Sequence, residues 1–368
     1  ALYDPDSPNW ESIAPDVAGF LTALNETEAS KWLPALDQIR DSLKPALISA
    51  YKNRVDEADN TPERAAAILA NLFANDVEFL VGLVSIASPQ QIPYLKVALE
   101  KKESEAVKQL RWVLERKQFA DTSEASIAVQ ESNLVTALIQ LADKTQFKKL
   151  AGGTDMSVAT ELIERLGPAG TSFEILAERF DRWESADSDV LSGVLLSLGQ
   201  YKQNQILTVQ KADLLPNLRR IFSEHPDSRV HSCARWLLQR WDEDLASLVM
   251  DLRTVQPKRD MNWHVDMLGN TFALFGPVTG FEMGFNESMA SGSEFDAASE
   301  REPTHRKSIP RRFGICIHEV TIGQFEEYEQ HFEDRVAKRV EQLDLKIAEL
   351  NDTVDPADDE TNKKNAKK

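Results

Sequence analysis

Long hydrophobic runs, cysteine pairs and clustered basic residues are all missing from this chain. No apolar run reaches the roughly 18 residues of a membrane-spanning helix, and no signal-peptide pattern stands at the start. The two cysteines, Cys233 and Cys316, form no C-x-x-C pair, so neither a metal knuckle nor a redox pair is indicated. A net charge of −18 argues against nucleic-acid binding, which needs clustered lysine and arginine, and against anionic membranes. We therefore expect a cytoplasmic protein that binds neither nucleic acid nor membrane.

Residues 10–250 lack strand-like alternation and show the spacing of amphipathic helices. Apolar residues recur three, four and seven positions apart, as in Leu134, Leu138 and Leu141. Hydrophobic residues make up 42% of the chain and charged residues 28%, which is enough apolar material for a sizeable core. The sequence therefore predicts a mainly α fold, with an irregular helical region over 1–120.

A repeat is visible in the second half of the helical region. The pattern Asp-x-x-Val opens three predicted helices, at Asp155, Asp187 and Asp227. Aspartate is a favoured N-cap because its carboxylate accepts the unpaired N–H groups of the first helical turn. Helix pairs that recur every 30 to 45 residues are typical of HEAT-like α-solenoids, in which each repeat buries its apolar face on its neighbours. We predict HEAT-like repeats over 121–252, followed by a linker at 253–262.

Short strands separated by glycine are predicted after the linker, and three sub-motifs follow one another there. The first is Gly280-Phe281-Glu282-Met283-Gly284, the second contains Glu302-Pro303-Thr304-His305, and the third joins Phe313 to Glu319-Val320-Thr321 and Phe325. Their order and spacing resemble the N-terminal part of the formylglycine-generating enzyme family, the sulfatase-modifying factors. The second motif is one residue shorter than the E-x-P-x-H of that family. The resemblance implies that 263–332 is the N-terminal part of such an α+β domain.

The resemblance assigns structural roles to the matched residues. In the family, two cysteines in the C-terminal half of the domain hold copper, which activates O₂ and oxidises a target cysteine to formylglycine. No residue of this chain matches those cysteines, so the resemblance implies a fragment or truncated member with no catalytic residue, cofactor or metal site of its own. The residues that match the family motifs are Gly280, Phe281, Met283, Gly284, Glu302, Pro303, His305, Phe313, Glu319, Val320, Thr321 and Phe325.

Two further features of this segment have structural interpretations. Three histidines, His305, His318 and His331, stand 13 residues apart, but equal spacing does not bring ligands together, so we predict no metal site. Glu319 is expected to make turn hydrogen bonds where the strand gives way to a helix capped by Thr321, rather than to act as an acid or base.

The apolar strand residues of this segment are expected to turn inward. Because the complete domain would cover them with elements that this chain does not match, we also expect an exposed apolar patch or a replacement cover. The six residues are Phe272, Phe281, Met283, Phe313, Ile315 and Ile317.

Residues 150–245 also resemble the irregular helical repeats that precede this enzyme domain in large bacterial proteins, particularly those of planctomycetes, which often begin with a serine/threonine kinase. The likeness rests on Leu195-Leu196-Ser197-Leu198-Gly199 and on the run from Cys233 to Trp241. The chain has no Gly-rich loop, no H-R-D and no D-F-G. Two alternatives therefore stand beside the truncated enzyme. One is a non-catalytic scaffold that binds a protein partner on its helical repeats, and the other is the regulatory C-terminal region of a kinase protein.

The last segment is predicted to form one amphipathic helix over 333–350. Its apolar residues have the spacing 4-3-4-3 and are Val336, Val340, Leu343, Ile347 and Leu350. Two heptads fit either a plain amphipathic helix or a weak self-association through 336–350. Residues 351–368 are acidic and then lysine-rich, and we predict that they form a disordered tail.

Overall fold

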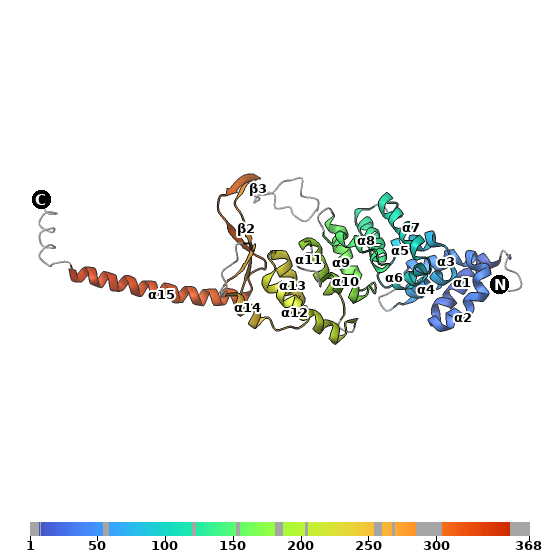
Figure 1. Cartoon of the computed structure of the whole chain (residues 1–368), viewed down its shortest axis with the longest axis horizontal. Coiled ribbons are helices and arrows are strands. Elements are labelled where there is room, and N and C mark those ends of the chain that lie inside the picture. Colours follow the sequence, from blue (N-terminus) through green and yellow to red (C-terminus); the bar gives the residue numbers. More distant parts are fainter. Residues whose placement is uncertain are drawn as a thin grey trace. The chain divides into compact units, whose positions relative to one another are not determined.

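The computed structural model describes residues 7, 9–53, 59–119, 123–151, 155–180, 187–202, 205–253, 260–266, 269–284 and 304–353 (Figure 1). The chain divides into two units, Ala1–Trp263 and His264–Lys368. The described part of the first unit is helical almost throughout, and the predicted mainly α class is confirmed. Within the described residues, no helix combines the length and the apolar character that crossing a membrane requires.

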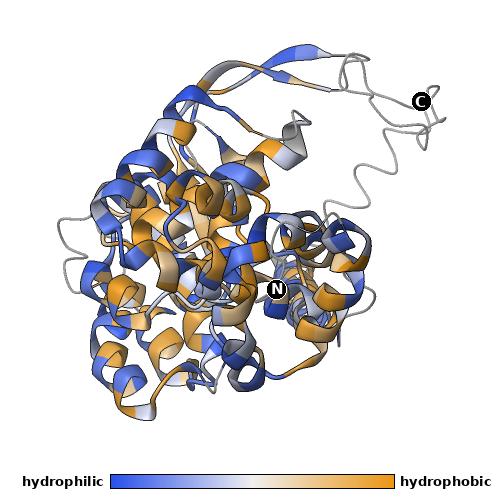
Figure 2. Ribbon diagram, turned by 90° about the vertical axis from the view of Figure 1, so that its right-hand side faces the viewer, coloured by the Kyte–Doolittle hydropathy of each residue, from blue (hydrophilic) through white to orange (hydrophobic). Residues whose placement is uncertain are grey.

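The helices of the first unit follow one another with short connections. They are α1 (Asn9–Ala23), α2 (Glu26–Leu36), η1 (Asp37–Ile39), α3 (Arg40–Lys52), α4 (Thr61–Leu72), α5 (Val77–Ser85), α6 (Ile92–Glu100), α7 (Glu103–Arg116), α8 (Glu124–Gln140), η2 (Lys144–Ala151), α9 (Met156–Leu166), α10 (Phe173–Phe180), α11 (Ser188–Leu198), α12 (Thr208–Glu224), α13 (Ser228–Arg240) and α14 (Ala246–Arg253). Figure 2 shows hydrophobic stripes alternating with hydrophilic ones along these helices, as amphipathic packing requires.

The three predicted Asp N-caps are confirmed. The carboxylate of Asp155 accepts from the backbone N–H of Val158 at 3.2 Å and starts α9. Asp187 and Asp227 accept from the first-turn N–H groups of α11 and α13 at distances of 2.8 to 3.3 Å. Each capped helix is followed along the chain by a second one, and α10 packs against α11 while α12 packs against α13.

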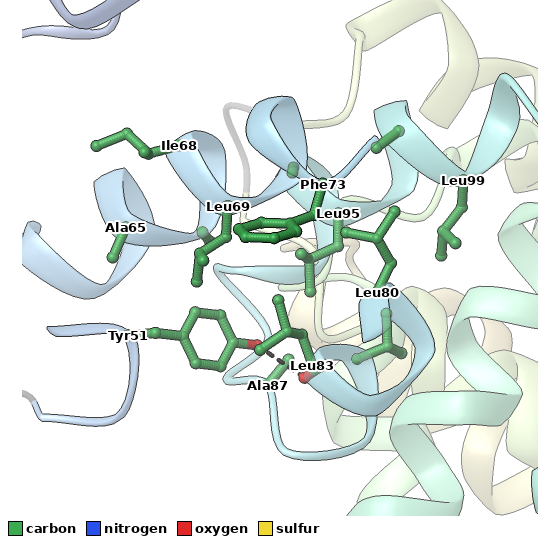
Figure 3. Close-up of a cluster of buried hydrophobic side chains, with 14 of the residues drawn as sticks. Tyr51, Ala65, Ile68, Leu69, Phe73, Leu80, Leu83, Ala87, Leu95 and Leu99 are labelled. Atoms are coloured by element: carbon green, nitrogen blue, oxygen red, sulfur yellow. Dashed lines mark hydrogen bonds between the residues drawn. The ribbon is translucent and has the colours of Figure 1, made fainter. Parts of the chain in front are cut away.

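A buried cluster from α3 to α6 forms the core of the N-terminal helices (Figure 3). The Tyr51 side chain extends through this cluster, and its hydroxyl donates to the carbonyl oxygen of Leu83 at 2.8 Å. Burial raises the pKa of Tyr51, so the hydroxyl keeps its proton and remains a donor. The Gln91 amide donates in turn to the carbonyl of Tyr51 at 2.8 Å. Polar side chains thus satisfy backbone groups inside an otherwise apolar core.

Helix α8 lies in the middle of the first unit and packs against α5, α7, α9 and η2. Contacts on several sides leave it without a solvent-facing stripe, and its polar residues are buried with its apolar ones. Asn133 is fully buried and donates to the carbonyls of Ser85 at 3.0 Å and Ala87 at 2.8 Å. Gln140 donates to the carbonyl of Ala169 at 2.8 Å. The amides of α8 therefore tie the end of α5 to the segment that follows α9.

The second unit contains short strands and one long helix. The division between the units falls inside β1 (Trp263–Val265), which with β2 (Thr271–Phe275) and β5 (Phe313–Cys316) forms a sheet of order β1-β2-β5. Strands β2 and β5 are antiparallel. Strands β3 (Val278–Met283) and β4 (His305–Ile309) form a separate antiparallel pair.

The expectation that the strand residues turn inward is wrong for two of the six. Met283 is 46% exposed and Ile315 is 55% exposed, while the other four are only partly buried. Alternation of apolar and polar residues along a strand gives the sheet one apolar and one polar face. It does not supply a second layer of structure that covers the apolar face.

Helix α15 (Ile322–Thr353) is continuous across two predicted boundaries. It begins well before residue 333 and continues three residues into the segment predicted to be disordered from residue 351. Residues 354–368 lie outside the described residues, as do 254–259 of the predicted linker.

Two helix-interior glycines give a matched test of the packing. A Cβ at Gly193 of α11 would lie 2.6 Å from Leu150 Cβ and 2.7 Å from the Leu150 carbonyl oxygen, whereas a Cβ at Gly82 of α5 would meet nothing within 4 Å. We expect Gly193→Ala to lower the free energy of unfolding by about 2 kcal/mol through overpacking. Gly82→Ala should raise it by about 0.5 to 1 kcal/mol, because alanine is the better helix former. Urea denaturation followed by far-ultraviolet circular dichroism measures both, and equal effects of the two variants would contradict this packing.

Candidate functional site

The described residues that match the family motifs do not converge on one site. Gly280, Phe281 and Met283 lie in β3 and Gly284 follows it, while His305 lies in β4 opposite Met283. Gly280 has a φ of +71°, which an L side chain rarely adopts, and its carbonyl accepts from Arg306 at 3.3 Å. Glu302 and Pro303 lie outside the described residues.

The remaining motif residues lie along the path from β5 into α15. Phe313 stacks on Phe275 with ring centroids 5.5 Å apart. Glu319, Val320 and Thr321 are exposed between the two elements, and Phe325 is 52% exposed in the first turns of α15. The arrangement therefore places these residues in a strand pair, a connection and a helix start.

The two cysteines and the candidate metal ligands can be located among the described residues. No group of three or more His, Cys, Asp or Glu side chains there is placed to hold a metal ion. Both Cys233 and Cys316 are free, and Cys233 is buried. Burial raises the pKa of the Cys233 thiol to about 11, so this group is protonated near neutral pH and is a poor nucleophile.

A buried histidine lies near the C-terminal end of the first unit, Ala1–Trp263, which is the helical unit. The His231 ring of α13 stacks between Phe222, at a centroid distance of 4.6 Å, and Trp263, at 3.8 Å. Its Nδ1 donates to the Phe222 carbonyl oxygen at 2.6 Å. Burial lowers the pKa of His231 to about 4, and Arg235 acts in the same direction. A neutral, fully enclosed imidazole of this kind holds a helix pair together and is inaccessible to a substrate.

A concave groove lies between α2 and α4. This groove has a volume of about 710 Å³, within the range of binding pockets. Its floor is made of buried apolar residues, namely Ala29, Leu33, Ala67 and Ile68. Its rim is polar and mostly exposed, with Asn25, Glu26, Thr27, Ser30, Asn60 and Asn71. An apolar floor with a hydrogen-bonding rim suits a segment that has one apolar and one polar side.

Helix α2 is held at the groove by its N-terminal cap. The Asn25 side chain accepts from the Glu28 backbone N–H at 2.9 Å and donates to the Glu28 carboxylate at 2.8 Å. These two bonds fix the first turn of α2, which supplies Glu26 and Thr27 to the rim. The Asn-x-x-Glu pattern is readable in the sequence as a helix start, although it gives no sign of the groove.

The groove carries an acidic bias. Glu26 and Glu63 both line it, and Glu63 is only 8% exposed. The lining cation, Arg64, donates to the carbonyls of Thr22 at 3.0 Å and Ala23 at 3.2 Å, at the end of α1. Two carboxylates and one guanidinium therefore line the groove, which leaves it a small acidic excess.

Comparisons of the chain with protein-family models, with curated proteins and with solved structures found no match.

The buried His231 predicts a loss of stability in mild acid. Above its ordinary pKa of 6.5 the imidazole is neutral in both the folded and the unfolded chain. The burial of His231 therefore costs no protonation free energy in this pH range. As the pH falls, the unfolded chain takes up the proton first, and stability is lost until the folded pKa of about 4 is reached. We expect a loss of about 2 kcal/mol in the free energy of unfolding between pH 7 and pH 5.

His231→Asn can keep the hydrogen bond to Phe222 but cannot titrate, so most of this pH dependence should disappear. A smaller part should remain, because burial also lowers the pKa of His225. His331→Asn, at an exposed position of α15, is the control and should retain the wild-type dependence. Urea denaturation at pH 7 and pH 5 measures the free energy of unfolding of all three proteins. If His231→Asn loses as much stability between the two pH values as the wild type, His231 is not the cause of the loss.

Proposed function

We propose that the helical unit is a non-catalytic protein-binding scaffold of HEAT-like α-solenoid type. In this proposal, a basic, amphipathic segment of a partner protein binds in the groove between α2 and α4. The observation that carries the proposal is the groove itself, with its apolar floor, its polar rim and its two carboxylates. The unpaired cysteines fit a reducing compartment such as the cytoplasm.

Neighbour-to-neighbour bonding supports the solenoid part of the proposal. Side-chain-to-backbone hydrogen bonds between non-adjacent segments of the described helices join residues that are 27 to 48 positions apart. Contacts over such short sequence distances are expected where each repeat touches only the next one along the chain. The capped helices also pack in chain order, α9 against α11 and α11 against α13.

The charge of the groove supports a basic partner segment. A Lys or Arg side chain at the rim of the groove could pair with the exposed Glu26, while apolar side chains on the same segment contact Leu33 and Ile68. The net charge of −18 favours the approach of a basic segment to the whole chain.

A second candidate function is that of a truncated formylglycine-generating enzyme, as the sequence motifs indicate. Its support is that β3, β4, β5 and the start of α15 fall on the motif segments in the family order. Its weakness is that neither Cys233 nor Cys316 matches the copper-binding cysteines of that family. This candidate therefore predicts no aldehyde from a C-x-P-x-R peptide with Cu(I) and O₂, and aldehyde above a no-protein control would contradict the truncation.

The scaffold proposal predicts a selective effect of filling the groove. Ser30 is an exposed rim residue, so Ser30→Trp should occupy the groove without disturbing the core. A phage-displayed library of random peptides selected on the wild-type chain should yield sequences rich in Lys or Arg. These should bind Ser30→Trp at least about tenfold more weakly, since the added indole excludes the peptide from the apolar floor.

Gln38→Trp is the matched control, because Gln38 is exposed in η1 and does not line the groove. It should retain peptide binding within about twofold. Selection of acidic peptides, or equal binding to Ser30→Trp and the wild type, would rule out a basic partner in this groove.

A further inference from the structure

Helix α15 carries an apolar stripe that is longer than the sequence pattern indicated. Its members stand three or four residues apart and are all 45% to 80% exposed: Ile322, Phe325, Tyr328, Phe332, Val336, Val340, Leu343 and Ile347. The side chain of Leu350 lies outside the described residues. At 3.6 residues per turn, the eight side chains share a sector of about 120°. Neighbouring rings on it contact each other, with the centroids of Tyr328 and Phe332 6.0 Å apart.

The two flanks of this stripe carry opposite charges. On one side, within about 100° of the centre of the stripe, lie Arg335, Arg339 and Lys346. On the other side lie Glu326, Glu333 and Asp344. All six side chains are exposed. A single helix gains little from this separation, since its basic and acidic flanks face away from each other.

The charge pattern selects one arrangement of two such helices. In a parallel pair, each basic flank faces the acidic flank of the other helix, whereas an antiparallel pair sets basic against basic and acidic against acidic. In heptad terms, Val340 and Ile347 occupy a positions, Val336 and Leu343 occupy d positions, and Arg339 lies at g. Asp344 then lies at e, which is the position that a g residue of a parallel partner reaches.

We propose that α15 is a self-association helix that binds α15 of a second copy of this chain in parallel and in register. Val336, Val340, Leu343 and Ile347 become the buried heptad seam, and the Arg339 of each copy pairs with the Asp344 of the other. The exposed apolar stripe continues N-terminally to Ile322, about 38 Å from Ile347 along the helix at 1.5 Å per residue, and its aromatic residues extend the apolar surface beyond the two heptads. This proposal does not depend on the groove between α2 and α4.

A matched pair of substitutions tests the seam in the full chain. Leu343 and Leu345 are both exposed, by 46% and 61%, but only Leu343 lies on the stripe. Sedimentation equilibrium over about 1 to 100 µM should show a wild-type dimer. Leu343→Asp should weaken association at least about tenfold, and Leu345→Asp should change it by less than about twofold. A monomeric wild type at 100 µM, or equal effects of the two variants, would overturn the proposal.

Charge reversal tests the orientation. In the parallel pair, Arg339→Glu should weaken association by roughly two- to fivefold, and the double variant Arg339→Glu with Asp344→Lys should restore it. In an antiparallel pair, Arg339→Glu would instead relieve repulsion and strengthen association. Since these residues are exposed, circular dichroism of each variant should match the wild type, and a strengthened Arg339→Glu dimer would refute the parallel arrangement.

Discussion

The helical unit depends on buried side chains that satisfy the backbone carbonyls of neighbouring helices. The last carbonyls of a helix have no partner within it, and leaving them buried and unpaired costs about 1 to 3 kcal/mol each. Asn133 of α8 meets this requirement at the end of α5, through Ser85 and Ala87, and its own oxygen accepts from Arg165 of α9 at 3.3 Å. The Asn133 amide thus joins α8 to the end of α5 and to α9, and its burial makes each bond depend on the position of the others.

The proposed binding surfaces follow from the same constraint. Arg64 caps the end of α1, and its guanidinium lines the α2–α4 groove beside two carboxylates. The buried polar side chains of the helical unit that make such bonds are not available to a partner, so binding is left to rims and outward faces. In the second unit, the short strands and α15 leave large apolar side chains exposed, among them Ile315 and Val340. Exposed apolar surface of this extent is typical of a site that a partner covers.

Local features of this fold were predictable from the sequence, and distant ones were not. Asp187 caps a helix through N–H groups two and three residues away, so the residue pattern contains the whole interaction. The partners of Asn133 lie 46 and 48 residues away, and nothing in the sequence pairs them. The groove was missed for a similar reason, because its two walls come from separate helices. The prediction for Ile315 was wrong because alternation distinguishes two faces of a strand without showing which of them another layer covers.

Replacement of Asn133 tests most directly whether α8 couples the helices on both sides of it. The account predicts that Asn133→Leu lowers the free energy of unfolding by about 2 to 3 kcal/mol. It also predicts faster amide hydrogen exchange both at the end of α5 and in α9, whereas Asn71→Leu, at an exposed position of α4, has little effect. Faster exchange confined to α8, or equal losses in the two variants, would contradict the claim that this buried amide holds the array together.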